Sequence, residues 1–187
     1  LFYQILLFSI IFIILNTKEA FGCVSTYGNT ETVISSDCNG SYRAYGANDT
    51  LTVNSGITMS GGANFYGTNT ELLNNGTITY YFQSVKSFDR ISNITNNGSL
   101  ISTGGIHVMS FSSTVDTFTN NGKLSTSGQD VIAHALVDNF NNAQGKKNSN
   151  PVSWRFSAPT NYNIIINSTS DYGQLESVSF TCAPPFG

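Results

Sequence analysis

The chain has 187 residues, of which only 10% are charged, and its formal net charge is −3. This weak negative charge and a pI near 5.1 argue against binding to the phosphate backbone of nucleic acids. Asn, Ser and Thr together make up more than a third of the chain and Pro is rare, whereas many Phe and Tyr supply apolar area for a core. Such a composition favours strands and turns over helices or disorder. The sequence therefore predicts an ordered, all-β chain.

Residues 1–22 differ from the rest of the chain. Residues 6–15 are almost wholly apolar, and the small residues Ala20 and Gly22 stand at the −3 and −1 positions before Cys23. This pattern predicts a cleaved secretory signal peptide over residues 1–22, because the apolar run is too short to span a membrane comfortably. We therefore expect export across the inner membrane to the cell surface or the medium, or to the periplasm if the chain is truncated.

All three cysteines of the chain follow the predicted cleavage site, and Cys23 follows it directly. In an oxidising compartment we expect Cys23 and Cys38 to form a disulfide bond, which leaves Cys182 without a partner. The alternative is a lipoprotein in which Cys23 carries the lipid. Phe21 and Ala20 argue against it, because lipoprotein signals prefer a small residue and Leu at those positions.

Residues 23–50 precede the first clear repeat, and we expect them to form an N-terminal cap region over the open edge of the fold. The sequon that begins at Asn39 lies in this region, and Asp37 stands two residues before it, as in a bacterial acceptor sequence. Asn39 is therefore a candidate glycosylation site.

Repeats occupy residues 51–143. Four segments share one pattern, in which apolar residues are followed by polar Asn or Ser and then by Gly, and residues 140–143 form a degenerate fifth copy. The repeat glycines recur at similar intervals and are Gly56, Gly76, Gly98 and Gly122. Asn-Gly is typical of tight turns, because both residues tolerate positive φ.

This period predicts a right-handed parallel β-helix with about 20–24 residues in each coil. Successive coils would stack at about 4.8 Å, so that inward Leu, Ile and Phe form a column and Asn residues form a ladder at a corner. The alternative is a sandwich of hairpins, which would place turn signals about every 8–12 residues. A single signal in each longer period favours the solenoid.

Residues 144–187 are expected to form a loop and further β coils. Residues 144–159 are polar and contain Pro, and the β-rich runs 162–168 and 175–180 follow. No terminal cap is recognisable, so we expect a truncated C-terminal end. The open strand edge at this end predicts self-association.

Few residues point to catalysis. His107 and His134 lie outside any metal-binding spacing, and neither a nucleophile elbow nor a phosphate-binding glycine loop occurs. Asp116 and Asp138 lie one repeat length apart, so stacked coils would bring two carboxylates together, as in β-helical glycosidases. With Arg90 near them, we expect charge compensation at a polar corner. We expect no enzymatic activity, no metal and no cofactor.

The Asn-Asn-Gly coils resemble the passenger domains of autotransporters, as does the segment 162–168 followed by Asp171-Tyr172-Gly173. The resemblance covers about residues 23–180 and is closest to vacuolating-cytotoxin-like and adhesin-like passengers. It implies a β-helix at the cell surface with a role in adhesion or virulence. Complete members of the family end in a membrane β-barrel, for which this chain has no room.

The resemblance leaves the ligand or host receptor open. We expect no nucleic-acid partner, and we expect outer-membrane association only through a barrel that this chain lacks. The aromatic run 80–82 offers contacts for a ligand, but we expect these side chains to pack in the core or at an edge. The alternatives in function are a carbohydrate-active β-helix enzyme and a lipid-anchored exported protein.

Overall fold

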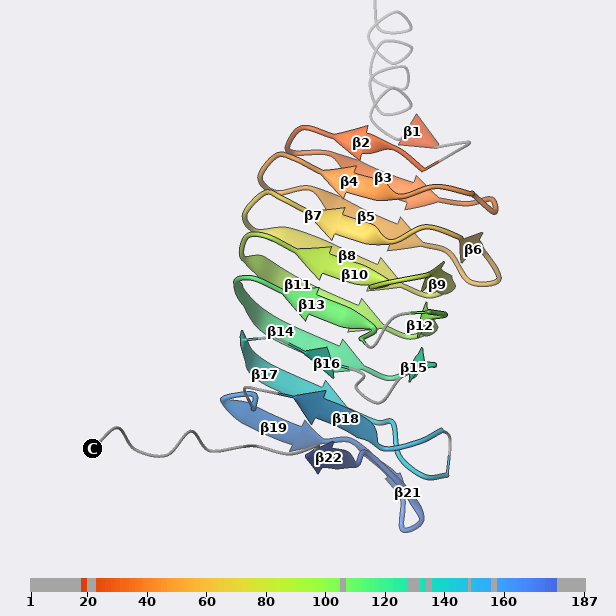
Figure 1. Cartoon of the computed structure of the whole chain (residues 1–187), viewed down its shortest axis with the longest axis vertical. Helices are drawn as coiled ribbons and strands as arrows, with labels where there is room; N and C mark the ends of the chain where they lie inside the picture. The colour runs from red at the N-terminus through yellow and green to blue at the C-terminus, as the bar shows by residue number, and fades with distance from the viewer. Residues whose placement is uncertain are drawn as a thin grey trace, which may run out of the picture.

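The computed structural model describes residues 18–19, 23–104, 107–127, 132–133, 136–147, 149–155 and 158–177. Every element in this part of the chain is a β-strand, and it contains no helix long and apolar enough to cross a membrane. The strands follow one another around a coil of about six turns whose axis is vertical in Figure 1. The predicted parallel β-solenoid is confirmed. Most of residues 1–22 lie outside the described residues, as do His134 and Cys182.

Two long parallel sheets and one short one form the walls of the solenoid. Sheet A contains β1 (Lys18–Glu19), β3 (Glu31–Ile34), β5 (Thr50–Val53), β8 (Thr70–Asn74), β11 (Ile91–Asn96), β14 (Thr114–Asn120), β17 (Leu136–Asn142) and β19 (Asn161–Ile164). Sheet B contains β2 (Ser25–Thr26), β4 (Tyr42–Ala44), β7 (Ala63–Phe65), β10 (Val85–Ser87), β13 (Met109–Phe111), β16 (Ile132–Ala133), β18 (Val152–Arg155) and β22 (Leu175–Ser177). Sheet C contains β6 (Thr58–Met59), β9 (Thr77–Tyr80), β12 (Ser99–Ser102) and β15 (Lys123–Thr126). An antiparallel hairpin of β20 (Ile166–Ser168) and β21 (Asp171–Tyr172) completes the strands of the described residues.

The register of sheet A stacks equivalent apolar residues inside the solenoid. Alternation along each strand turns every second side chain inward, so one such residue from each coil joins a column. The column consists of Leu51, Leu72, Ile94, Phe118, Phe140 and Tyr162. The rings of Phe118 and Phe140 stack with their centroids 5.0 Å apart. The expected apolar column is therefore present.

An asparagine ladder runs beside this column inside the solenoid. Asn74, Asn96, Asn120 and Asn142 are fully buried at the ends of four successive sheet A strands. In each rung, the Nδ2 of one Asn donates to the Oδ1 of the next, over 2.8, 2.8 and 3.0 Å. Because buried amides are costly unless they are paired, the stacking supplies partners along the whole ladder except for the Oδ1 of Asn74 at its first rung.

A second asparagine ladder runs along the outside of the same corner. Asn97 Nδ2 donates to Asn75 Oδ1 over 2.8 Å, and Asn121 Nδ2 donates to Asn97 Oδ1 over 2.9 Å. The first Asn of each Asn-Asn-Gly repeat therefore faces the core, and the second faces solvent. The predicted corner ladder is confirmed, and it is double.

The repeat glycines have two different roles. Gly56 adopts a positive φ of 78°, as expected for a turn, whereas Gly76, Gly98 and Gly122 do not have positive φ. A Cβ at Gly98 would lie 1.9 Å from the carbonyl oxygen of Gly76, and a Cβ at Gly122 would lie 2.1 Å from that of Gly98. The turn explanation holds for Gly56 alone, because the other glycines allow successive corners to stack in close contact.

Residues 23–50, which we expected to form a cap region, already contribute strands to sheets A and B. Cys38 makes an isolated parallel bridge with Met59, so it extends the line of sheet C by one rung. The disulfide bond between Cys23 and Cys38 is present, with the two Cα atoms 5.8 Å apart. It ties the start of the described coils to this corner.

Sheet C stops at β15, where a side chain takes the place of the next strand. The Oε1 of Gln144 accepts from the N–H of Leu124 over 2.6 Å, and its Nε2 donates to the Leu124 carbonyl over 3.1 Å. Beyond this point the chain continues as β18, β19 and β22, with the β20–β21 hairpin at the corner. Gln144 thus pairs backbone groups that β15 would otherwise leave unpaired.

A buried polar cluster connects the first coils of the solenoid. The fully buried Asp49 accepts from Thr26 Oγ1 over 2.8 Å and from the N–H of Thr30 over 3.0 Å. The single hydroxyl hydrogen of Thr26 is used in that bond, so the Tyr42 hydroxyl donates to Thr26 Oγ1 over 3.1 Å. Burial raises the pKa of Tyr42, and the negative charge of the Asp49 carboxylate adds to this rise.

This raised pKa predicts a loss of stability at alkaline pH. The pKa of Tyr42 is higher in the folded chain than in the unfolded chain, where it is about 10. The unfolded state therefore releases its proton first, so stability is constant below about pH 10 and falls as the pH rises further. We expect Tyr42→Phe to reduce this slope in urea unfolding curves recorded at alkaline pH. An identical slope in the variant would contradict the assignment.

Candidate functional site

Two acidic residues lie on neighbouring coils of sheet A. Asp116 and Asp138 follow Val115 and Val137, which pair in register between β14 and β17. Val115 and Val137 are buried, whereas both acids face outward. The expected juxtaposition of the two acidic positions is therefore present.

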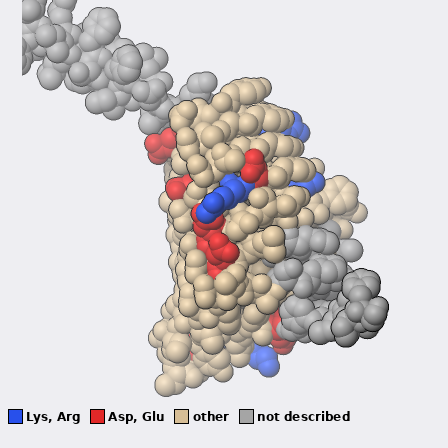
Figure 2. Space-filling view, turned by 90° about the vertical axis from the view of Figure 1, so that its left-hand side faces the viewer, with Lys and Arg blue, Asp and Glu red and all other residues tan. Residues whose placement is uncertain are grey.

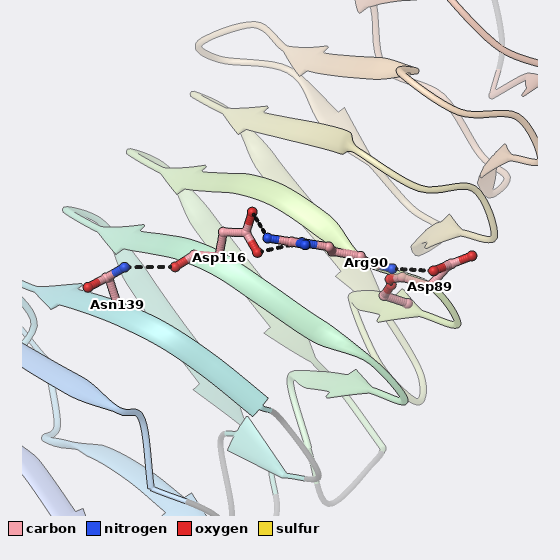
Figure 3. Close-up of polar contacts among 5 residues, drawn as sticks. Asp89, Arg90, Asp116 and Asn139 are labelled. Atoms are coloured by element: carbon pink, nitrogen blue, oxygen red, sulfur yellow. Dashed lines mark hydrogen bonds and ion pairs between the residues drawn. The ribbon is translucent and has the colours of Figure 1, made fainter.

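Arg90 holds the first of these carboxylates. Its Nε donates to Asp116 Oδ1 over 2.8 Å and its Nη2 to Oδ2 over 2.9 Å, so the ion pair is bidentate (Figure 3). The Arg90 N–H donates to Asp89 Oδ1 over 2.7 Å, and Asn139 Nδ2 donates to the Asp116 carbonyl over 3.2 Å. The hydrogen bond and the charge of Asp116 raise the pKa of Arg90, and the charge of Asp138 contributes to the rise.

This arrangement favours charge neutralisation over acid–base chemistry. A general acid or base needs a carboxyl group that is within reach of a substrate proton and free to exchange it. Both oxygens of Asp116 are bound to the Arg90 guanidinium, and the pair lies in contact with solvent. Figure 2, which views the side that carries the turns from sheet B to sheet A, shows charged side chains in a few small groups on a largely uncharged surface.

We expect this ion pair to contribute little to stability, because exposed pairs are screened by salt. Asp116→Asn should lower the melting temperature slightly at low ionic strength, and the difference should disappear in about 1 M NaCl. Thermal unfolding monitored by circular dichroism at both ionic strengths measures this effect. A large decrease that persists in high salt would mean that the carboxylate has another structural role.

A column of exposed aromatic rings runs along the same side of the solenoid, at the turns that connect sheet B to sheet A. Figure 1 shows these turns on its left-hand side. It consists of Tyr27, Tyr45, Tyr66 and Phe88, one from each of four successive coils. Their centroids are separated by 5.6, 4.9 and 4.6 Å, and adjacent rings are nearly parallel. The Lys86 ammonium lies 4.5 Å from the centroid of Phe88 and closes that end of the column by a cation–π contact.

Exposed amides flank the aromatic column. Asn29, Asn48 and Asn69 follow the three tyrosines in the same turns and have φ of 51°, 58° and 54°. Asn tolerates this left-handed conformation better than most residues. Asn48 Nδ2 donates to Asn29 Oδ1 over 3.1 Å, so the coil spacing also aligns these side chains. We call the four rings and three amides the corner strip.

The corner strip was not predicted, although the sequence contains a signal for it. Each tyrosine is followed by Gly and, after at most one further residue, by Asn, as in Tyr27-Gly28-Asn29 and Tyr66-Gly67-Thr68-Asn69. The interval between the first two tyrosines is shorter than the interval between the second and the third, and the turns differ in length. This irregularity hid a repeat that the constant Asn-Asn-Gly unit made visible elsewhere.

The other aromatic candidates lie at the end of β9 and directly after it, and Figure 1 shows this strand on the opposite side of the coil. Tyr80, Tyr81 and Phe82 are exposed, so of the two expected positions, core or edge, they occupy the edge. Tyr81 and Phe82 contact each other edge to face at 4.9 Å, and Tyr81 lies where a Cβ at Gly104 would be. These rings lie at the edge of the coil where β9 ends, and they contact one another edge to face rather than in a parallel stack.

The remaining candidates carry no recognisable chemistry. His107 is half-buried just before β13, and the part of the chain that the structure covers holds no group of three or more metal-ligating side chains. The sulfur of Cys23 is engaged with Cys38 and in that state cannot bear a lipid. Asn39 is exposed next to Cys38, and its glycosylation stays a prediction.

Two surface hollows lie on the part of the chain that the structure describes. One of about 560 Å³ lies below β15, beside Gln144, and is lined mainly by polar groups that include Lys123, Lys146 and Glu176. Another of about 530 Å³ lies on the outer face of sheet A, between Glu31 and Thr95. Both are open and shallow, unlike the enclosed, largely apolar pockets that take small molecules.

Comparison with known proteins adds no assignment. No family model matches the chain, and no curated protein and no solved structure shows significant similarity to it.

Proposed function

We propose that this chain is a segment of an exported surface protein of the autotransporter-passenger type, and that it acts by binding in adhesion rather than by catalysis. The observation that carries the proposal is the corner strip, where coil stacking aligns exposed rings and amides on one side. Solenoids present extended surfaces of this kind to large partners. A scaffold of this shape also occurs in enzymes, so the proposal depends on the site and not on the fold.

Two further observations support the proposal. The disulfide bond between Cys23 and Cys38 indicates an oxidising compartment, as expected for an exported protein. Asp116 and Asp138 are the acidic residues that resembled a catalytic pair, and the carboxylate of Asp116 is bound by Arg90.

Bead adhesion tests the binding role. Beads that carry the purified full chain should adhere to epithelial-cell monolayers, whereas beads that carry albumin should not. Equal adherence of the two kinds of bead would contradict the adhesive function.

Processing tests the export. The whole chain, expressed in a Gram-negative host, should be recovered outside the cytoplasm with an N-terminus at Cys23 and an oxidised Cys23–Cys38 pair. Retention in the cytoplasm with an uncleaved N-terminus would contradict the exported location.

A further inference from the structure

We infer that the corner strip binds a neutral, chain-like glycan. Its terminal sugar ring packs on the open face of Tyr27, the sugars that follow run along the ring edges of the column, and their hydroxyl groups bond to the asparagine amides. This inference rests on the proposed adhesive function and specifies its ligand. The column extends over three successive centroid separations of 5.6, 4.9 and 4.6 Å, so the strip suits an extended ligand rather than a single small molecule.

The aromatic column offers one open ring face and a row of ring edges. The inner rings are covered by their neighbours, and the Lys86 ammonium covers the outer face of Phe88. Tyr27, at the other end, is 80% exposed and has no ring beyond it among the described residues. A sugar ring presents an apolar face of C–H groups, which packs well against an open aromatic face. Tyr27 is therefore the natural anchor for the end of the ligand.

The amides supply what the hydroxyl groups of a glycan need. Each side-chain amide carries two donor hydrogens and an acceptor oxygen, so it can bond to hydroxyl groups in either sense. Asn29, Asn48 and Asn69 are all exposed and are held by backbones of the same conformation. Because the rings and amides are already ordered by stacking, ligand binding loses little side-chain entropy.

Charge favours a neutral ligand over an acidic one. The corner strip contains no charged side chain. Arg43 and Lys86 lie on the sheet B side, and Glu31 and Glu71 lie on the sheet A side. Asp89 and Arg90 directly follow Phe88, and Arg90 is paired with Asp116, so these charges add no excess of positive charge. A polyanion such as a nucleic acid or an acidic polysaccharide would meet no excess of positive charge.

A glycan array tests this inference with the full-length chain. The probes are neutral gluco-, galacto-, manno- and N-acetylglucosamine oligosaccharides, together with sialylated and uronic-acid oligosaccharides. We expect retention of at least one neutral series, and affinity for it is then measured by calorimetry. Tyr27→Ala should weaken that affinity about tenfold, the scale of an interface anchor. Asn29→Gly, which keeps the positive φ but removes the amide, should also weaken it.

Tyr81→Ala is the matched control, because Tyr81 is an exposed tyrosine on the opposite side of the coil. It should leave the affinity unchanged. Failure to bind any neutral glycan, preference for the acidic ones, or equal affinity in all three variants would overturn the inference. If beads that carry the protein still adhere to cells in that case, the adhesive function stands and only the ligand is wrong. If wild-type beads do not adhere, the proposed function itself fails, whatever the array shows.

Discussion

Gly98→Ala should destabilise the chain by at least about 4 kcal/mol or prevent it from folding, on the scale of the most damaging single substitutions. The new methyl group would lie 1.9 Å from the Gly76 carbonyl oxygen, a backbone atom that belongs to the neighbouring corner. This steric clash can be relieved only if the two coils separate at the corner. Separation disturbs the backbone hydrogen bonds that pair the coils, such as the bond from the Ser99 N–H to the Gly76 carbonyl. Urea unfolding followed by circular dichroism measures the effect.

Gly56→Ala is the matched control for this prediction. A Cβ at Gly56 meets nothing within 4 Å, but its φ of 78° makes an alanine there strained. We expect a cost of about 1 to 2 kcal/mol, which is the penalty for an L-residue in the left-handed region. If Gly56→Ala were the more damaging variant, turn conformation rather than coil stacking would explain the repeat glycines.

Asn96→Ala should lower the free energy of unfolding by about 4 kcal/mol, because it disrupts a buried hydrogen-bond network. Asn96 is fully buried, accepts from Asn74 Nδ2 and donates to Asn120 Oδ1, each over 2.8 Å. Removal of the Asn96 amide leaves the buried Oδ1 of Asn120 without this donor and the Nδ2 of Asn74 without this acceptor. Each buried polar group left unpaired costs about 1–3 kcal/mol, and the cavity left by the side chain adds to the loss.

Asn97→Ala, one residue further along, provides the comparison. Asn97 belongs to the outer ladder, where water replaces the lost hydrogen bonds, so we expect a change below about 1 kcal/mol. Urea unfolding of both variants separates the two ladders. Similar losses at the two positions would show that the inner ladder has no special role in stability.

Regular features of the fold were predictable from the sequence. The three Asn-Asn-Gly units, each preceded by apolar residues, fix both the coil length and the corner at which the coils stack. Strand alternation then assigns the inward column, because every second residue must face the core. The disulfide bond followed from the position of Cys23 and Cys38 after a predicted export signal.

Features that depend on irregular turns were not predictable. The corner strip escaped detection because its turns vary in length, so a fixed period does not align Tyr27, Tyr45 and Tyr66. Charge compensation of the acidic pair by Arg90 was expected, but the bidentate contact to Asp116 required the structure. It spans more than one coil length, because the arginine lies in the turn before its strand. The role of Gly98 and Gly122 also required the structure, since the sequence alone cannot distinguish a turn glycine from one that allows close stacking.

The measurement that tests the account most directly is a set of distances along the stack, because the corner strip exists only if the coils lie in register. Thr52, Thr119 and Asn163 face outward in one row of sheet A, where Thr119 is three coils and Asn163 five coils from Thr52. At about 4.8 Å for each coil, the backbone separations are about 14 Å and about 24 Å. Double electron–electron resonance between spin labels on these residues should show distances that grow in this proportion. Distances that do not grow with the number of coils would contradict the stacked solenoid and the strip built on it.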